Sequence, residues 1–362
     1  TKLTQSGSET ERYFLAKAYT YRGKRKLSNF KIKFAPDYSE VELIRARTIN
    51  ADGVFPVDST EVNEIIAPGY SGATVYTKVK QMVISMPAFA ESSVIEVHYK
   101  IKKNKDAPVP FGGMNVLVGE EPARKVFFAL SGKNIHYKAV SGAPKPVIAG
   151  NTANWTIENY KGARFESDMP PLRELFPTIL YSASRNWTDE IENIAGMFLP
   201  HTVGNDEIAA LAESLSADKS KREALENILY YVQEKFNKIH IEPNWVGYRP
   251  NDAAVVFKNG YGDSRDLSVL LIAMLNAAGI KAKPALIESN GAKIWDFPTV
   301  HQFSKVVVMA DLDGEKIFLN PMDEYASAGY LGAANGEKSL IISPGQSNLT
   351  KIPDLTPEDN VG

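Results

Sequence analysis

A change of hydrophobic period near residue 186 is the feature that most constrains this chain. Before it, apolar and polar residues alternate in short runs: Phe30, Ile32 and Phe34 alternate with lysines, and residues 95–101 follow the same pattern. An alternation of period two predicts strands with one buried and one solvated face. After residue 186 apolar residues recur every three or four positions, which predicts helices. The two halves therefore belong to different structural classes.

The first half is expected to consist of strands joined by turns. Turn signals such as Asp52-Gly53, Pro68-Gly69 and Gly112-Gly113 separate the apolar runs. Further strands are predicted at 41–49, 79–86, 124–130, 134–140 and 153–158. Many short antiparallel strands are typical of a β-sandwich. No helix is predicted before residue 186, and the polar first twelve residues are expected to be poorly ordered.

The second half is expected to mix helices and strands. Helices are predicted over 188–198 with Thr188 as its cap, near 206–215, over 221–236, and from Ser264 to a terminating Gly279. Residues 303–320 are predicted to form a hairpin that turns at Asp313-Gly314. The fold class is therefore α+β. The predicted domains are a β-sandwich at 1–185, an α+β domain at 186–342, and a linker at 343–362 towards a further domain.

One polar segment leads into the most apolar helix. Residues 260–266 read Gly-Tyr-Gly-Asp-Ser-Arg-Asp, and Asp263 and Asp266 fit the N-cap and third positions of that helix. Ser264 then lies in the first turn, where the helix dipole favours negative charge and assists a nucleophile. By position alone, a capped core helix without chemistry is the more common interpretation.

The segment YGDSRDLSVLLIAMLNAAGIKAKPALI resembles the nucleophile helix of the transglutaminase-like, papain-related superfamily, whose bacterial members commonly read Gly-Asp-Cys-x-Asp. FSKVVVMADLDGEKIFLNPMDEY resembles that family's Phe-Asn-His strand, turn and Asp-Pro strand. The first half, with SSVIEVHYKI, is similar to the β-sandwich that precedes this module in exported bacterial proteins. The resemblance implies a transglutaminase-like domain after a β-sandwich, and an exported location, periplasmic or on the cell surface.

All three catalytic positions implied by the resemblance are substituted. Ser264 stands in place of the Cys nucleophile, Lys305 in place of the His base and Asn320 in place of the orienting Asp, and the chain contains no cysteine. A serine hydroxyl needs an adjacent base, lysine is normally protonated at pH 7, and asparagine cannot stabilise an imidazolium by charge. Three changes together indicate natural loss of activity. We expect a non-catalytic protein whose retained cleft binds a peptide, a glycan or a protein partner.

An active alternative remains open. Ser264 and Lys305 form a Ser–Lys dyad of a serine peptidase or amidase if Lys305 is desolvated and Asn320 is hydrogen-bonded to it. His301 has the strand parity of Lys305, but four residues of strand advance roughly 13 Å, so it cannot take that position without a bulge. The alternative for His301 is a rim histidine.

Aromatic residues upstream of the helix are candidates for the ligand cleft. In the resembled family the segment that contains Trp245 and Tyr248 lines the cleft, and the alternative is that both anchor a loop over the core. Tyr261, Asp263 and His301 complete the predicted cleft.

Composition excludes several other functions. The chain has 41 Lys and Arg against 43 Asp and Glu, and this balance argues against a nucleic-acid binder. The five histidines are scattered, and His240 with Glu242 lacks a third ligand, so we expect no metal and no cofactor. No apolar run approaches the ~20 residues that span a bilayer. The sequence begins at Thr1 without an apolar leader, and we expect that a leader was removed or the chain trimmed.

Overall fold

The structure is a computed structural model that describes residues 1–4, 7–70 and 78–355. Its contacts divide the chain into two compact units. The N-terminal unit holds Thr1–Ala107 with Ala129–Lys133 and Gly150–Ala153, and the C-terminal unit holds Pro108–Phe128, Asn134–Ala149 and the chain from Asn154. The boundary predicted at residue 186 lies inside the second unit and stays a prediction about domains. No helix of the described part is long and apolar enough to cross a membrane.

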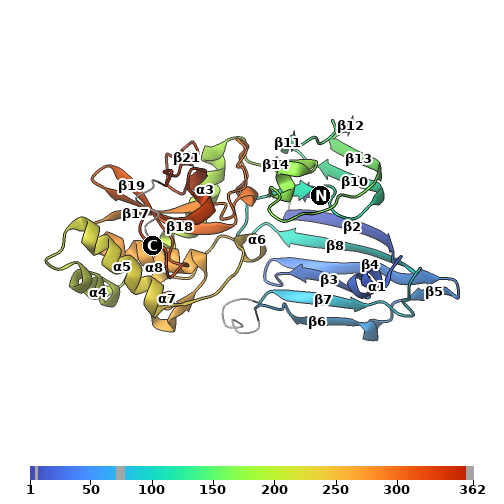
Figure 1. The fold of residues 1–362 in the computed structure, drawn as a ribbon, viewed down its shortest axis with the longest axis horizontal. Helices are drawn as coiled ribbons and strands as arrows, with labels where there is room; N and C mark the ends of the chain where they lie inside the picture. Colours follow the sequence, from blue (N-terminus) through green and yellow to red (C-terminus); the bar gives the residue numbers. More distant parts are fainter. Residues whose placement is uncertain (5–6, 71–77, 356–362) are drawn as a thin grey trace. The chain divides into compact units, whose positions relative to one another are not determined.

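The N-terminal unit is a β-sandwich, as the sequence predicts. One sheet is built on the antiparallel order β2-β8-β4-β5, with β1 beside β2, and the other has the order β3-β7-β6 (Figure 1). Alternate side chains of both sheets, among them Ile32, Ile84 and Val97, share one core. The elements are β1 (Lys2–Thr4), β2 (Gly7–Lys17), α1 (Tyr21–Leu27), β3 (Asn29–Phe34), β4 (Ser39–Asn50), β5 (Gly53–Pro56), β6 (Val62–Ile66), β7 (Lys80–Ser85) and β8 (Val94–Asn104).

Two predictions for this unit are wrong. The described part of the polar N-terminus is ordered, because β2 pairs with β8 along its whole length, from Gly7 to Lys17, while residues 5–6 lie outside the described part. Helix α1 precedes residue 186, begins after its cap Thr20 and contains no buried residue. A helix that buries nothing has no apolar period, so the pattern that predicts helices cannot reveal it.

The C-terminal unit places helices against an antiparallel sheet of order β19-β18-β17-β20-β21. Its helices are α2 (Leu172–Leu175), α3 (Trp187–Phe198), α4 (Asp206–Ser216), α5 (Lys221–Lys235), α6 (Pro243–Val246), α7 (Ala253–Asn259) and α8 (Ser264–Ala277). Its strands are β9 (Gly112–Val116), β11 (His136–Val140), β12 (Val147–Ala149), β14 (Thr178–Ser182), β15 (Asn237–Lys238), β16 (Tyr261–Gly262), β17 (Lys281–Ile287), β18 (Lys305–Leu312), β19 (Glu315–Leu319), β20 (Lys338–Ile341) and β21 (Thr350–Lys351). Two further strands, β10 (Ala123–Ser131) and β13 (Thr152–Tyr160), have residues in both units.

Helix α8 is the centre of this unit. It packs against α4, α5 and α7 and against the sheet strands β17 and β18 (Figure 1). Every residue from Ser264 to Leu275 is buried, and a helix that is apolar all round is stable only in such a position. Gly279 follows the helix with φ of 77°, the left-handed conformation predicted for it.

Strand β18 separates two cores by its alternation. Val306 and Val308 belong to the core that contains α8, whereas Val307 and Met309 belong to a smaller core on the opposite face of the sheet. The predicted hairpin is confirmed, since β18 and β19 pair across the Asp313-Gly314 turn. The α8 helix therefore contacts only one of the two faces of β18.

Local details differ from the predictions at two places. Helix α3 begins at Trp187 and is capped by Asn186 rather than Thr188, because the Asn186 side chain accepts the hydrogen bond of Asp189 N–H. The expected linker from residue 343 is packed at first: β21 pairs with β20, and Ile352 is fully buried in the smaller core. Residues 356–362 lie outside the described part.

Candidate active site of the C-terminal unit

Ser264 occupies the first position of α8 and faces β18. Its side chain is 5% exposed, and its Oγ accepts the hydrogen bond of Val306 N–H at 3.4 Å. Val306 follows Lys305 directly, so Ser264 and Lys305 lie at the same end of β18. The structure thus brings together two of the three positions that the sequence singles out.

The neighbours of Ser264 hold the helix start in place. Asp263 is the N-cap, and its Oδ1 accepts from the N–H groups of Arg265 at 2.8 Å and Asp266 at 3.4 Å. The Arg265 guanidinium pairs with the same carboxylate and donates to the carbonyls of Gly247 at 2.7 Å and Arg249 at 3.0 Å. Asp263 is fully buried, so its predicted place in the ligand cleft is wrong: its carboxylate is used inside the protein.

Asp266 is a second buried carboxylate in the first turn. Its Oδ1 accepts from the backbone N–H of Asn251 at 2.7 Å and its Oδ2 from Asn251 Nδ2 at 3.3 Å. Burial raises the pKa of Asp266 to about 7, although these hydrogen bonds oppose the shift. Asp266 therefore fixes the loop that precedes α7 against α8.

Lys305 begins β18, opposite Ile287 of β17, and is half-buried. Burial lowers the pKa of its ammonium, and the charge of Asp323 partly offsets the effect. Among the described residues, none forms a hydrogen bond or an ion pair with Lys305 Nζ, Ser264 Oγ included. The geometry needed for a Ser–Lys dyad is thus absent from this conformation of the described chain.

Asn320 follows β19 and is 6% exposed. Its Oδ1 accepts from Met322 N–H at 3.2 Å, which stabilises the turn rather than orienting Lys305. Its carbonyl accepts from Gln233 Nε2 at 3.0 Å, and the same amide donates to the Ala326 carbonyl at 2.9 Å. Gln233 was not predicted as a site residue, and its only signal in the sequence is that it is a polar residue on the apolar face of the predicted helix 221–236.

The predicted cleft aromatics have different outcomes. Tyr248 is fully buried and donates its hydroxyl to the Val300 carbonyl at 3.1 Å, so the ligand-lining role is wrong and the loop-anchor alternative holds. Tyr261 is half-buried in β16, and its cleft role stays a prediction. The side chain of Trp245, in α6, lies outside the described part of the chain.

His301 lies in a short 3₁₀ turn, Val300–Gln302, before β18 rather than on the strand. Its Nε2 is 3.3 Å from the carbonyl oxygen of Pro110, and its ring lies near Gly112 of β9. The proposed register change that would bring His301 to the position of Lys305 does not occur, because Lys305 itself pairs with Ile287.

Two buried charged groups missed by the sequence analysis hold the segment before β18. Arg173 donates to the carbonyls of Gln302 and Ala292, each at 2.8 Å, and pairs with Glu288 at 3.2 Å. Glu190 of α3 accepts from Val300 N–H at 2.8 Å and from the Ser184 hydroxyl. Burial raises the pKa of Glu190 to about 7. Neither residue has a sequence signal, since Glu190 resembles an ordinary acid of a first helical turn.

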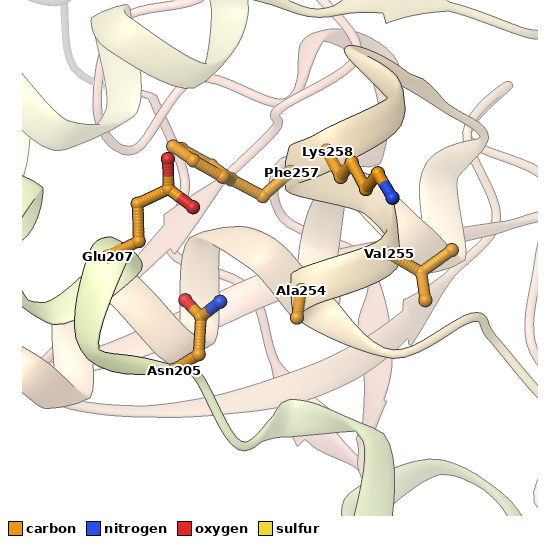
Figure 2. A pocket seen from close by; sticks show the side chains of 6 residues that line it. All are labelled: Asn205, Glu207, Ala254, Val255, Phe257 and Lys258. Atoms are coloured by element: carbon orange, nitrogen blue, oxygen red, sulfur yellow. The ribbon is translucent and has the colours of Figure 1, made fainter.

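A shallow hollow of about 510 Å³ lies elsewhere, between the start of α4 and helix α7. Figure 2 shows its lining, with Asn205 and Glu207 from one side and four residues of α7 from the other. None of the predicted site residues lines it. Within the described ranges, no three His, Asp or Glu side chains are grouped to hold a metal ion.

Comparisons with known proteins agree with this architecture. Residues 209–307 match the model of the transglutaminase-like superfamily, and residues 5–164 match a domain of unknown function, DUF3857, for which structures are solved. A crystal structure of a "putative protease" from Parabacteroides distasonis has 18% identity and a TM-score of 0.83, covering 98% of this chain and 70% of that chain. A "putative cysteine protease" from Cytophaga hutchinsonii has 10% identity and a TM-score of 0.25, over 88% of this chain and 83% of that chain. No curated protein matches the chain.

The C-terminal unit therefore carries a transglutaminase-like domain, preceded by a β-rich domain of the DUF3857 type. The helix that begins at Ser264 and the start of β18 lie within the matched residues 209–307. Asn320 lies beyond them, directly after β19, the strand that pairs with β18. The resemblance to the transglutaminase-like superfamily is confirmed, and the exported location and the substituted catalytic positions stay predictions.

Proposed function

We propose that this protein is a non-catalytic member of the transglutaminase-like fold that binds a peptide, glycan or protein partner near Ser264 and Lys305. The observation that carries the proposal is the hydrogen bonding of Ser264. Its Oγ takes the Val306 N–H, and no described group is placed to remove its proton. A serine without a base is a weak nucleophile.

The positions of Lys305 and Asn320 support the same conclusion. An acyl-transfer site needs a base that contacts the nucleophile and a group that orients the base. Lys305 Nζ forms no hydrogen bond with Ser264 or Asn320, and the Asn320 side-chain oxygen accepts from Met322 N–H in its own turn. We also propose, from the resemblance alone, that the protein acts outside the cytoplasm.

Labelling with a fluorophosphonate probe tests the proposal, because the probe reacts covalently with activated serines. We expect no labelling of the full chain at pH 7 to 9, with a known serine hydrolase as the positive control. Labelling that disappears in Ser264→Ala would contradict the proposal. The triple variant Ser264→Cys, Lys305→His and Asn320→Asp restores the residues of the resembled family. Its activity would show whether the rest of the fold still supports catalysis.

One observation favours the active alternative, a serine peptidase or amidase. Burial lowers the pKa of Lys305, which is the direction that a lysine base requires. The alternative predicts labelling that is lost in both Ser264→Ala and Lys305→Met and that increases with pH as the ammonium loses its proton. A label that survives in Lys305→Met would exclude the dyad.

A further inference from the structure

We infer that the N-terminal unit carries a docking surface for a second copy of this chain, on the face of its larger sheet that points away from the core. This outer face consists of the side chains of β2, β8 and β4 that alternate with core residues such as Ile95 and Val97. It is exposed, and its charges are separated into two ends of opposite sign. The surface is independent of the function that we propose for the C-terminal unit.

The strand register fixes which side chains share the outer face. Directly opposite residues of antiparallel strands point to the same side of a sheet, so Leu15, Glu96 and Arg47 form one row across β2, β8 and β4. Tyr13 and Arg45 lie in the next row, and both contact Glu96: the Tyr13 hydroxyl donates to its Oε1 at 3.2 Å, and Arg45 Nη1 lies 3.4 Å from the same oxygen. Tyr13 is 60% exposed, Leu15 56% and the Arg45 side chain 51%, so the outer face is open to solvent.

One end of the outer face is basic. Arg45 and Arg47 pair with the single carboxylate of Glu96, and Lys17 lies in the last row, opposite Val94. This basic end therefore has three cations and one anion, a net charge of +2 with histidine counted as neutral. The side chain of Glu96 is only 4% exposed, so it fixes the two guanidinium groups while they remain accessible. Side chains that are already ordered lose less entropy when a partner binds.

The opposite end of the outer face is acidic. Its two rows hold four carboxylates and two ammonium groups, which belong to Glu9, Glu11, Glu40, Glu42, Lys100 and Lys102. The lysines pair within this acidic end, since Lys102 Nζ is 2.8 Å from Glu42 Oε2 and Lys100 Nζ is 3.9 Å from Glu9 Oε1. The net charge of the acidic end is −2, equal and opposite to that of the basic end.

A second copy of the chain fits this distribution of charge. A two-fold dimer buries the same patch of both copies, so that patch must be complementary to itself. When two outer faces meet with their strands antiparallel, the basic end of each copy lies over the acidic end of the other, and both contacts are attractive. The row of Tyr13 then lies near the two-fold axis, and tyrosine is enriched in protein interfaces. A partner of uniform charge would match one end of the face and be repelled by the other.

The expected association is weak. Three neighbouring strands lie about 4.8 Å apart, so they present a narrow face, and small interfaces are typical of transient complexes. Exposed charges also attract less as salt is added, because the Debye length falls from about 10 Å at 0.1 M to about 3 Å at 1 M. We therefore expect a dimer that dissociates with increasing salt.

Sedimentation velocity of the full chain tests the inference. At a protein concentration of about 0.2 mM, we expect a monomer–dimer equilibrium in about 0.05 M NaCl and mainly monomer in about 0.5 M NaCl. A chain that remains monomeric at both salt concentrations would overturn the inference. A dimer that is equally stable at both would reject the opposed charges as its cause.

Charge changes at each end assign the dimer to the outer face. Glu40→Lys with Glu42→Lys makes both ends basic and is expected to weaken self-association about tenfold or more. Lys17→Glu with Arg45→Gln makes both ends acidic, leaves Arg47 on Glu96, and is expected to have a similar effect. An equal mixture of the two double variants should associate again, because each basic end now meets an acidic one. A mixture that stays monomeric would contradict the antiparallel arrangement.

A matched control separates the outer face from the total charge of the protein. Glu213→Lys with Glu234→Lys alters the net charge as much as Glu40→Lys with Glu42→Lys, but at exposed positions of α4 and α5. This control is expected to dimerise like the parent. Equal weakening in the control, or unchanged dimers in both variants of the outer face, would reject the docking surface.

Discussion

The first turn of α8 and the end of β18 that faces it are neighbours with opposite character. In the first turn, the Asp263 carboxylate has a buried cation, Arg265, and two backbone donors. At the strand end, Lys305 has no ion-pair partner in the described part, and the amide nitrogen of Asn320 has no acceptor there. The charged groups at the start of α8 are thus paired inside the protein, whereas the Lys305 ammonium at the strand end has no such partner in the described part.

This difference separates the residues that stabilise the unit from the positions that we propose to take part in binding. A buried charge whose partner is removed costs several kcal/mol, because its desolvation is no longer compensated. A half-exposed cation that already lacks a partner loses little when it is replaced. The same fold can therefore keep its framework while the residues at its reactive positions change, and the following variants measure how complete that separation is.

The largest effect is expected for Arg265→Met. The change removes the cation from Asp263 and the donors from the carbonyls of Gly247 and Arg249, while it keeps an apolar stem. We expect a loss of about 3–5 kcal/mol in the free energy of unfolding by urea denaturation. The double variant with Asp263→Asn should recover part of it, since no uncompensated carboxylate remains. Arg222→Ala, an exposed helical pair with Glu226, is the control and should cost less than about 0.5 kcal/mol. If Arg265→Met and Arg222→Ala lower the free energy of unfolding equally, the buried ion pair of Arg265 stabilises the unit no more than an exposed pair does.

Glu190→Gln sharpens the comparison through pH. The pKa of Glu190 is raised from 4.5 to about 7, so the folded state binds the proton more tightly than the unfolded state. Its stabilising contribution is complete below pH 4.5 and is lost as the pH rises through about 7, by about 3 kcal/mol. Gln keeps both the acceptor for Val300 N–H and a donor for Ser184, so the variant should be more stable than the parent at pH 8 and lack this part of the pH dependence. The test is to measure the unfolding midpoints of the parent and of Glu190→Gln at pH 5 and at pH 8. If the midpoints of both proteins change equally between the two pH values, the prediction is contradicted.

Gln233→Met tests the framework on the side of Asn320. The substitution keeps the shape of a fully buried side chain but removes the donor shared by the carbonyls of Asn320 and Ala326. At about 1 kcal/mol for each hydrogen bond, we expect a loss of about 2 kcal/mol. Glu234→Leu, the exposed neighbour on α5, is the control and should change stability by less than about 0.5 kcal/mol. If Gln233→Met leaves the free energy of unfolding unchanged, the loop after β19 keeps its conformation without this amide.

Patterned burial explains what the sequence predicted. The strands of the sandwich, the helix from Ser264 and the hairpin that turns at Asp313-Gly314 all have an apolar face with a period, and the structure contains them. Helix α1 has no such face, and the packing of Ile352 depends on a strand pair more than ten residues away, so neither was predicted. A hydrophobic period indicates an element with one buried face, and it cannot reveal an element that lies wholly on the surface.

The sequence predicted which residues belong to the candidate site but not which hydrogen bonds they form. The sequence located Ser264, Lys305 and Asn320 because motif spacing survives substitution. It placed Tyr248 and Asp263 in a ligand cleft, because nothing in their type distinguishes a buried anchor from an exposed contact. Which polar groups are saturated depends on backbone groups such as Val306 N–H, which every sequence contains.

Lys305→Met is expected to have the smallest effect on the free energy of unfolding and, like Glu190→Gln at pH 8, to increase it. Because burial lowers the pKa of Lys305, the unfolded chain binds its proton more tightly, and the charged ammonium opposes folding at neutral pH. Methionine removes that penalty, so the variant should be slightly more stable at pH 7, by less than about 1 kcal/mol. The difference should shrink as the pH rises from the lowered pKa, where the folded parent becomes neutral, to 10.5, where the unfolded chain becomes neutral too. Thermal unfolding at pH 7 and 10 measures both points, with Lys283→Met as the exposed control. A destabilised Lys305→Met would mean that the ammonium has a partner after all, and the contrast between the paired charges at the start of α8 and the unpaired ammonium at the start of β18 would then fail.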